Sequence, residues 1–457
     1  MNLTRRELML GGSAAALAAA GAAPRPNFVF ILVDDLRYDA LGCTGHPFVK
    51  SPNVDRLARE GMNFTNAFVT TPLCSPARGS FLTGQYVRTH GIMDNSNRSE
   101  ASHKLVTFPK LLRDAGYETA YVGKWHMGND ATPRPGFDKW VSFPGQGQYT
   151  DPRMNIDGNA IQAQGYMTDL LNNHAVEFIR KPHSKPFCLY LAHKAVHGPF
   201  TPAERHKSLY EGAKIERRPS AKDTLEGKPA LKKGLAAEAQ VVRKKNAAPA
   251  HSGPSDETIL NQLRCLSSID DGVGLIYEAL KATGQLDNTL IVFTSDNGYL
   301  WGEHGLGDKR AFYEESIRIP MVARYPKLIR AGSRTKEMAL NIDIAPTFLD
   351  LAGAKVPSGM QGRSLRPVMA GQAKTWRKSF LGEYYEEKQF PRIATWDGVR
   401  TERYKLTRYA SMEGADELYD LDKDPYEMKN LAQDPAAKGI LKEMQAELEK
   451  LRKEIQA

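Results

Sequence analysis

The fold is decided by residues 27–35, where Asn27-Phe28-Val29-Phe30-Ile31-Leu32-Val33 runs directly into Asp34-Asp35. A continuous apolar run of this kind is typical of a parallel strand that is buried on both faces. Ligands of open α/β sheets bind at the carboxyl ends of the strands, which is where the two acids stand. The stretch therefore predicts a parallel sheet with a functional site at one edge.

Three later apolar stretches end in the same manner, each followed at once by side chains that can bind metals, anions or protons. They are residues 289–294 before Ser295-Asp296-Asn297-Gly298, residues 119–123 before Lys124-Trp125-His126, and residues 187–192 before His193-Lys194-Ala195-Val196-His197. An acidic pair after one strand is more often a turn or a helix cap. Four strands that deliver such residues to one edge instead predict a single site.

Helical patterns alternate with these strands. Residues 52–61 and 108–116 each have a proline near the start and a glycine at the end, as helices commonly do. Residues 258–283 form a long amphipathic stretch that is stopped by Gly284. This alternation predicts an α/β fold with a mostly parallel central sheet and helices on both faces.

The pattern changes after Gly362. Short stretches typical of antiparallel strands are followed by an amphipathic helix; the strands are residues 396–400, 403–406 and 416–421, and the helix is residues 438–456. We expect a large domain over residues 23–362 and a smaller C-terminal α+β domain with an antiparallel sheet over residues 363–457.

Composition and charge narrow the class of partner. The chain has 457 residues, of which 41% are hydrophobic and 25% charged, so it is neither disordered nor fibrous as a whole. Its formal net charge of +9 indicates an anionic partner, which can be nucleic acid, anionic lipid or an acidic polysaccharide. Residues 206–256 predict a basic, partly helical surface insertion. We interpret it as a solvated charged loop, with a polyanion-binding surface as the alternative.

The N-terminus is typical of a bacterial export signal. Arg5-Arg6 precede a weakly apolar stretch rich in alanine and glycine, and Ala20-Gly21-Ala22 offers a cleavage site. Residues 1–22 therefore predict a twin-arginine-type signal peptide and a periplasmic or secreted protein. A Sec-type signal is the alternative. The stretch is too short and too rich in small residues to be a stable membrane anchor.

One cysteine lies where a helix is expected to begin. In Leu73-Cys74-Ser75-Pro76-Ala77-Arg78-Gly79-Ser80-Phe81-Leu82-Thr83-Gly84, the proline suits the first helical turn and Gly84 can end the helix. The positive end of the helix dipole favours an anion at Cys74. Cys74 is thus a candidate activated thiolate, with a structural cysteine as the alternative.

The spacing Cys74-x-Pro76-x-Arg78, followed by Leu82-Thr83-Gly84, resembles the signature of the type I, formylglycine-dependent sulfatases of the alkaline-phosphatase-like superfamily. Further motifs match in the family's order along nearly the whole mature chain. They are Asp34-Asp35, Gly123-Lys124-Trp125-His126, His197-Gly198-Pro199-Phe200, Asp296-Asn297-Gly298, Gly302-Glu303-His304-Gly305, Lys309, Tyr313-Glu314-Glu315-Ser316, Glu417-Leu418-Tyr419-Asp420-Leu421 and Asp424-Pro425. Ala77 departs from the serine that the family commonly has, and we do not expect it to prevent modification of Cys74.

The resemblance implies an alkaline-phosphatase-like fold and a modified nucleophile. A formylglycine-generating maturation enzyme would oxidise Cys74 to Cα-formylglycine, whose hydrate attacks sulfur. It also implies a divalent cation, Ca²⁺ or Mg²⁺ in its place, at hard ligands. The implied ligands are Asp34, Asp35, Asp296, Asn297 and the modified side chain of Cys74. The implied catalytic residues are Arg78 to hold the hydrate, Lys124 and Lys309 on the sulfate oxygens, His126 as the base and His197 as the acid. His193 is a neighbour of these residues and, with Lys309, the alternative to His197 as the acid.

The resemblance further implies a sulfated carbohydrate substrate, and no nucleic acid partner. Residues 135–138 and 143–147 resemble those of bacterial carbohydrate sulfatases, including ones that act on N-acetylglucosamine 6-sulfate. Candidate substrate-binding residues, for which plain loop roles are the alternative, are Asn95, Arg98, Trp301 and His304.

Two other functions remain open at this point. Zinc-dependent phosphodiesterases and phosphonate hydrolases of the same superfamily typically have Asp-His where this chain has Asp296-Asn297. An amide is a poor substitute for an imidazole ligand of zinc, so an oxygen-rich site favours sulfate esters. A non-catalytic protein that binds sulfated glycans is the other alternative, although none of the expected catalytic residues is missing.

Overall fold

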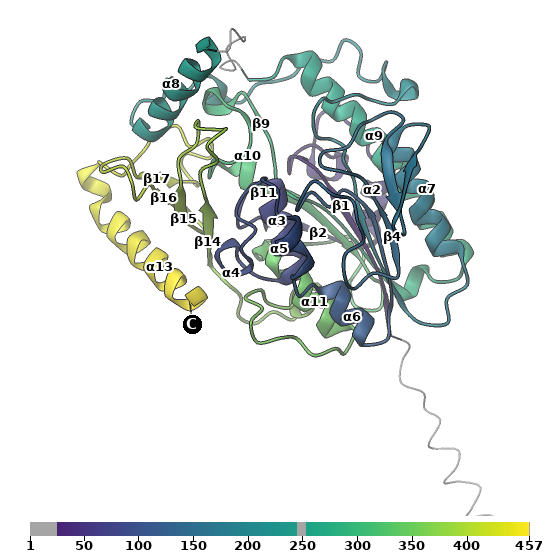
Figure 1. Cartoon of the computed structure of the whole chain (residues 1–457). Coiled ribbons are helices and arrows are strands. Elements are labelled where there is room, and N and C mark those ends of the chain that lie inside the picture. Colours follow the sequence, from purple (N-terminus) through teal and green to yellow (C-terminus); the bar gives the residue numbers. More distant parts are fainter. Residues whose placement is uncertain (1–24, 245–252, 457) are drawn as a thin grey trace, which may run out of the picture.

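The computed structural model describes residues 25–244 and 253–456, and the proposed signal peptide lies outside them. A large sheet forms its centre (Figure 1). In spatial order its strands are β12 (Ser333–Thr335), β2 (Met62–Phe68), β11 (Arg318–Arg324), β8 (Thr289–Ser295), β1 (Asn27–Val33), β7 (Phe187–Ala192), β3 (Glu118–Gly123), β4 (Lys139–Ser142), β5 (Arg153–Ile156) and β6 (Asn159–Gln162), with β13 (Ala339–Leu340) beside β2.

The middle of this sheet is parallel, as the apolar runs predict. β8, β1, β7, β3 and β4 pair in parallel, whereas β11 and the β5–β6 hairpin run antiparallel to their neighbours. Leu32 of β1 pairs with Ala192 of β7 and with Thr294 of β8. This register places the ends of the strands level, so the polar residues that follow them meet at one edge.

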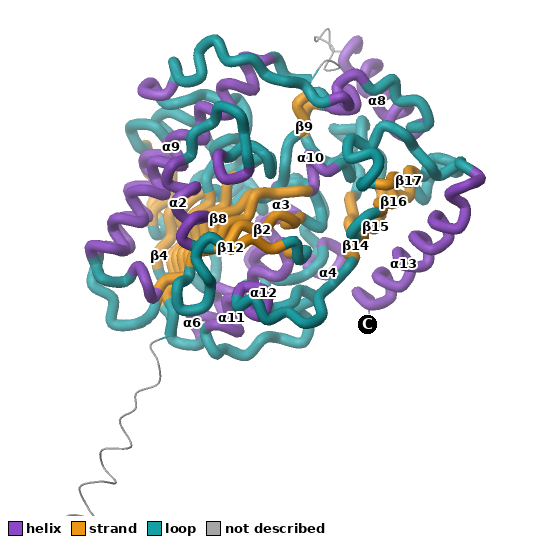
Figure 2. Tube along the Cα trace, turned by 180° about the vertical axis from the view of Figure 1, so that it is seen from behind, coloured by secondary structure: helices purple, strands orange, loops and turns teal. Residues whose placement is uncertain are grey.

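Helices cover both faces of the sheet, which explains why β1 is apolar on both sides. Val29, Ile31 and Val33 pack into a core with helices α2 (Pro52–Glu60), α7 (Met167–Arg180) and α9 (Asp256–Ala282). The alternate residues Phe28, Phe30 and Leu32 pack into a second core with α3 (Cys74–Thr83), α6 (Phe108–Asp114) and α11 (Ile344–Leu351). Figures 1 and 2 show the two groups of helices on opposite sides of the sheet.

The expected helices are confirmed within a few residues. α2 and α6 end before their glycines, and α9 begins two residues before Thr258, where Ser255 Oγ accepts a hydrogen bond from the Thr258 N–H (3.1 Å). Four further helices are short, and they are α4 (Val87–His90), α5 (Ser99–His103), α10 (Glu314–Ile317) and α12 (Arg366–Met369). Single 3₁₀ turns are η1 (Gly42–Thr44), η2 (Glu204–His206), η3 (Pro219–Lys222), η4 (Leu286–Asn288), η5 (Glu303–Gly305), η6 (Asn341–Asp343) and η7 (Pro435–Ala437).

A second, antiparallel sheet follows in the C-terminal region, as expected. Its strands are β14 (Ser379–Tyr384), β15 (Trp396–Thr401), β16 (Tyr404–Arg408) and β17 (Glu417–Asp420), and β14 was not anticipated from the sequence. Helix α13 (Lys438–Gln456) packs along this sheet (Figure 1). Phe312 joins the sheet to the rest of the molecule, because its ring fills the space above Gly382 and Gly398.

The basic insertion is partly helical, with η3 and α8 (Pro229–Lys244), as expected. It is anchored as well as exposed. Ser220 and Lys228 are fully buried, and Ala230 and Leu231 belong to the core of the C-terminal sheet. The interpretation of the whole insertion as a solvated loop is therefore wrong for the part around Lys228. A two-stranded ribbon, β9 (Leu300–Trp301) and β10 (Gly307–Asp308), lies on the loop that the insertion covers. None of the described helices has the length and apolar character of a membrane span.

Candidate active site

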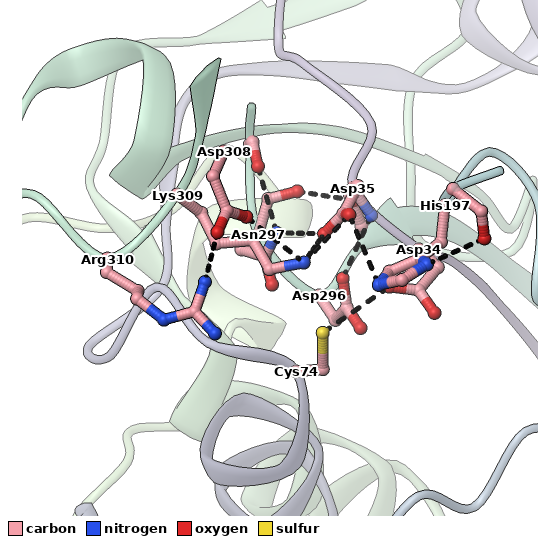
Figure 3. Close-up of polar contacts among 12 residues, drawn as sticks. Asp34, Asp35, Cys74, His197, Asp296, Asn297, Asp308, Lys309 and Arg310 are labelled. Atoms are coloured by element: carbon pink, nitrogen blue, oxygen red, sulfur yellow. Dashed lines mark hydrogen bonds and ion pairs between the residues drawn. The ribbon is translucent and has the colours of Figure 1, made fainter. Parts of the chain in front are cut away.

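Four acidic or amide side chains stand at the ends of β1 and β8 (Figure 3). Asp34 and Asp35 follow β1, and Asp296 and Asn297 follow β8. Asp35 has a left-handed backbone conformation (φ 63°), and its N–H donates to Asp296 Oδ1 (3.1 Å). Asn297 Nδ2 donates to Asp35 Oδ1 (2.6 Å). The two strand ends therefore form one connected group, as the sequence predicted.

Cys74 is the first residue of α3 and faces this group. Its Sγ lies 3.6 Å from Asp34 Oδ1, and the side chain is fully buried. Burial raises the pKa of the Cys74 thiol to about 12, although Lys309 and Lys124 act in the opposite direction. Desolvation therefore opposes the activated thiolate that the helix start predicts for the unmodified residue.

Three cations compensate the three carboxylates. Arg78 donates to Asp296 Oδ2 from Nε (2.9 Å) and Nη2 (2.7 Å), and its Nη1 donates to the Lys124 carbonyl (2.6 Å). Lys124 forms a buried ion pair with Asp34. Lys309 Nζ donates to both oxygens of Asp35 (2.7 and 2.8 Å). All three cations are thus held where an anion entering the group would meet them.

The carboxyl groups differ in their protonation. Burial alone would raise the pKa of Asp34, but Lys124 and Arg78 outweigh it and hold that pKa well below its ordinary value. Burial, together with the charge of Asp34, raises the pKa of Asp296 to about 7. Arg78 opposes this rise but does not outweigh it. A cation bound between the carboxylates would favour the ionised form of Asp296 further.

The side chains fit a divalent metal. Asp34, Asp35 and Asp296 can each offer one carboxylate oxygen, and these oxygens lie within 4.8 Å of one another. The fourth expected ligand is Asn297, whose Oδ1 is buried and has no hydrogen-bond partner among the described residues. A buried acceptor left without a donor is costly unless a cation binds it. Four hard oxygen donors suit Ca²⁺ or Mg²⁺ better than zinc.

Two of the histidines border the group. His126 Nδ1 lies 3.4 Å from Ser75 Oγ, and this hydroxyl donates to the His126 carbonyl (2.6 Å). His197 Nε2 lies 3.8 Å from Asp35 Oδ2, and its side chain keeps 20% of its surface exposed. Burial and the nearby Lys124 lower the pKa of both histidines well below the ordinary value. Both imidazoles are therefore neutral near pH 7 in the absence of a bound anion.

His193 does not join this group. It is buried, and its Nδ1 has no hydrogen-bond partner among the described residues. Burial lowers the pKa of His193 to about 3, so it stays neutral throughout the physiological range. The structure supplies no contact that gives His193 a part in the reaction.

The four expected substrate-binding residues fall in different places. Asn95 Oδ1 accepts the Ser75 N–H (3.0 Å), directly beside Cys74, whereas Arg98 pairs with Asp94 (3.0 Å). Trp301 is 7% exposed and donates from Nε1 to Gln262 (2.7 Å). His304 is fully buried, with its ring stacked on Tyr313 at 3.8 Å. Substrate contact stays a prediction for all four, and the contacts of Trp301 and His304 favour packing roles.

Two polar residues that the sequence did not single out lie beside Lys309 (Figure 3). Asp308 and Arg310 form an ion pair, and Arg310 Nε also donates to Glu387 Oε2 (2.7 Å). Because both residues flank Lys309 in the sequence, the motif could have indicated that they lie near the site. Nothing in the sequence indicated Glu387, because it comes from the loop between β14 and β15.

A mostly parallel sheet with a group of buried carboxylates at its carboxyl edge, and a buried cysteine at the start of a facing helix, is the architecture of the alkaline-phosphatase-like hydrolases. The chain belongs to the sulfatase family. The family model "Sulfatase" matches residues 26–354, and "N-sulphoglucosamine sulphohydrolase, C-terminal" matches residues 302–454. The protein is therefore a sulfatase.

Curated relatives agree with this assignment. The chain is 34% identical to an N-acetylglucosamine-6-O-sulfatase of Bacteroides thetaiotaomicron, covering 89% of this chain and 82% of the relative. It is 31% identical to the human N-acetylglucosamine-6-sulfatase, covering 83% of this chain and 71% of the relative.

Solved structures give the same fold. A structure in complex with its substrate D-glucosamine-2-N,6-O-disulfate superposes with a TM-score of 0.85 and 32% identity, covering 94% of this chain and 98% of that one. The phosphonate monoester hydrolase of Agrobacterium radiobacter superposes with a TM-score of 0.76 over 94% of this chain and 96% of that one. At 23% identity, this second likeness supports the fold alone.

Proposed function

We propose that this sulfatase hydrolyses carbohydrate sulfate esters, with the 6-O-sulfate of N-acetylglucosamine or glucosamine as its substrate. The observation that carries the proposal is the complete charged group around Cys74, on a fold most of which superposes on a structure that holds a 6-O-sulfated glucosamine. The names of the bacterial and human relatives support the same sugar and position.

A divalent cation, Ca²⁺ or Mg²⁺ in its place, would be held by Asp34, Asp35, Asp296 and Asn297. The buried, unpartnered Oδ1 of Asn297 supports this assignment. The cation would neutralise negative charge on the transferring sulfuryl group and lower the pKa of the nucleophile.

Cys74 is converted to Cα-formylglycine by a maturation enzyme. The spacing Cys74-x-Pro76-x-Arg78 and the position of Cys74 at the start of α3, facing Asp34, support this proposal. The hydrated aldehyde has two hydroxyl groups, so one can attack sulfur and the other can later expel sulfate. Covalent catalysis of this kind divides one difficult step into two.

The cations bind and orient the ester. Arg78 reaches the group from α3 and holds the hydrate, while Lys124 and Lys309 exchange their carboxylate partners for sulfate oxygens. Preorganised charges of this type stabilise negative charge that develops in the transition state.

The histidines move protons. The attacking hydroxyl gives its proton to solvent before the attack, and His197 takes up a second proton, on Nε2, when the anionic ester binds. As the ionised oxygen bonds to sulfur, the bond between sulfur and the sugar oxygen breaks, and the sugar oxygen keeps the electron pair and takes the proton of His197 Nε2. The ester's negative charge offsets Lys124 and Lys309, which otherwise help burial to lower the pKa of His197. His126 then accepts the proton of the second hydroxyl as sulfate leaves and the aldehyde is regenerated.

Beside this centre, Asp308, Arg310 and Asn95 are placed to contact the sugar. They are polar, and they lie next to Lys309 or Ser75. A paired carboxylate and guanidinium can accept and donate hydrogen bonds to hydroxyl groups, which suits a carbohydrate.

The test compares three esters at equal concentration, namely N-acetylglucosamine 6-sulfate, an aryl phosphodiester and an aryl phosphonate monoester. Formylglycine-containing enzyme should release sulfate with a kcat/KM at least roughly 100-fold above either phosphorus ester, a difference of about 2.7 kcal/mol. Galactose 6-sulfate is the matched control for the sugar. Faster phosphonate hydrolysis would replace the proposal with the phosphonate hydrolase, and no turnover of any ester would leave a glycan-binding protein.

Export and domain organisation complete the proposal. Residues 1–22 direct twin-arginine export to the periplasm or beyond, residues 23–362 form the catalytic domain and residues 363–457 the smaller one. Replacing Arg5 and Arg6 by lysine should retain the protein in the cytoplasm, measured by cell fractionation. Unchanged export of that variant would indicate the Sec route.

A further inference from the structure

Lys194 is a buried cation without an ion-pair partner. Its side chain is 1% exposed, and no carboxylate of the described residues forms an ion pair with it. Burial lowers the pKa of Lys194 to about 8, with Lys124 acting in the same direction. Burying an unpaired ammonium is costly, and an apolar side chain would fill the same space without that cost. The lysine therefore needs a reason beyond packing.

Its contacts close the turn that carries His197. The Lys194 Nζ donates to the Gly198 carbonyl (2.9 Å), and the Lys194 carbonyl accepts the His197 N–H (3.1 Å). The ammonium also lies 4.8 Å from the centre of the Tyr149 ring, whose hydroxyl donates to the His197 carbonyl (2.6 Å). Lys194 thus holds both ends of the turn 194–198.

The same carbonyl orients the imidazole. His197 Nδ1 lies 3.0 Å from the Gly198 oxygen, and since a carbonyl can only accept, Nδ1 carries the proton in that contact. Nε2 is then directed toward Asp35, 3.8 Å away. The turn is fixed to the metal-binding edge, because Val196 N–H donates to the Asp34 carbonyl (2.9 Å) and Asp34 N–H to the Ala195 carbonyl (3.1 Å).

We propose that Lys194 is a positioning residue for His197, which fixes the Gly198 carbonyl so that His197 Nε2 points at the oxygen of the departing alcohol. The inference rests on the proposed role of His197 as the acid. Lys194 itself transfers no proton and does not touch the substrate. Its removal therefore affects the step in which the sulfur–oxygen bond of the alcohol breaks, and the demand on that step depends on the leaving group.

The test compares two esters in single-turnover experiments with formylglycine-containing enzyme. N-acetylglucosamine 6-sulfate releases a poor leaving group that needs an acid, whereas 4-nitrophenyl sulfate releases a good one that does not. Lys194→Met should slow the sugar ester roughly 10- to 100-fold and the aryl ester by at most about threefold, as a misplaced catalytic group does. Lys194→Arg keeps a cation and a donor and should recover most of the loss. Lys139→Met, a lysine of β4 paired with Asp157, is the matched control.

His197→Ala, alone and combined with Lys194→Met, separates this inference from the proposed function. If the two act as one unit, the double variant is no slower on the sugar ester than His197→Ala. Equal losses of both esters in His197→Ala would remove the acid and this inference together. A selective loss in His197→Ala with equal losses in Lys194→Met would overturn the inference alone. Should Lys194→Met fail to fold, Lys194→Gln, which keeps a polar side chain, is read by the same criteria.

Discussion

The described residues include two clusters of buried charge that can be compared. The first is the active-site group around Cys74. The second, which we call the seam cluster, joins the insertion, η5 and the C-terminal sheet, and its residues are Asp223, Lys228, His304, Lys405 and Glu427. Both clusters contain lysine–carboxylate pairs from which water is excluded.

The clusters differ in what their cations hold together. Lys228 donates to the Glu427 carbonyl (2.6 Å), lies 2.9 Å from His304 Nδ1 and pairs with Asp223, so one ammonium joins three separate segments. In the active site, Lys124 and Lys309 each neutralise a strand-end carboxylate beside Cys74. Burial of charge therefore does not distinguish the proposed catalytic centre from the seam cluster, whereas position at the carboxyl ends of parallel strands does. Variants of the first cluster should cost activity, and variants of the second should cost stability.

The largest expected effect is that of Cys74→Ala. Loss of the nucleophile should reduce sulfate release by roughly 10⁴- to 10⁶-fold, as removal of a covalent nucleophile does elsewhere. The free energy of unfolding should change by only about 1 kcal/mol. Turnover and thermal melting measure the two, and mass spectrometry of residues 71–88 of the active wild-type enzyme should show the aldehyde or its hydrate. Full activity of a preparation in which Cys74 is unmodified would contradict the proposal that formylglycine at this position is the nucleophile.

The next largest expected effect is that of Asp296→Asn, which removes one charge and leaves Arg78 with the Asp34 carboxylate alone (3.3 Å). Activity should fall about 10³-fold, since a metal supplies several kcal/mol of charge stabilisation. Elemental analysis should find one Ca²⁺ or Mg²⁺ per wild-type chain and much less in the variant.

Asp343→Asn is the matched control for that variant, because Asp343 is equally buried but pairs with Arg377 away from the site. It should keep its metal and lose stability instead. Two zinc ions per wild-type chain would contradict the proposed Ca²⁺ or Mg²⁺ site and favour the alternative function as a phosphodiesterase.

The active-site cluster could be predicted from the sequence because its residues follow buried strands directly. A parallel register then brings Asp34, Lys124, His197 and Asp296 to one edge without further information. The seam cluster could not be predicted, since Lys228 and Glu427 are far apart in the chain and meet only through tertiary packing. The same reason explains why β14 was missed and why the contacts of His304 with Tyr313 and Asp223 could not be predicted.

Lys405→Met tests the seam. Lys405 is fully buried and pairs with Glu427, so its loss leaves a buried carboxylate without a cation and should destabilise the fold by about 3–5 kcal/mol. Burial, aided by the charge of Glu314, already raises the pKa of Glu427 to about 7, and the variant lacks the cation that opposes this rise.

The pH dependence of that variant has a definite sign. A carboxyl group whose pKa is higher in the folded than in the unfolded state binds its proton more tightly when folded, so stability increases as the pH falls. The melting temperature of Lys405→Met should therefore recover between pH 8 and pH 6, relative to wild type. Lys309→Met is the corresponding lysine variant in the active-site group. With Ca²⁺ present, its activity should fall roughly 10²- to 10³-fold. If Lys405→Met has the melting temperature of the wild type at pH 8, the seam cluster contributes little to the stability of the fold.

The smallest expected effect is that of His304→Gln, and it separates the two clusters most sharply. His304 is buried against Tyr313, with Nδ1 2.6 Å from an Asp223 oxygen, so the substitution removes a stacked ring but keeps a polar side chain. The free energy of unfolding should fall by about 1 kcal/mol, and KM for N-acetylglucosamine 6-sulfate should change by less than about twofold.

Asn95→Ala is expected to have the opposite effect, on substrate binding and not on stability, because Asn95 contacts Ser75 beside the nucleophile. It should raise KM about 3- to 10-fold with little change in melting, as loss of a substrate hydrogen bond does. A tenfold rise in KM for His304→Gln at unchanged stability would make His304 a substrate residue, and the distinction between the clusters would then fail.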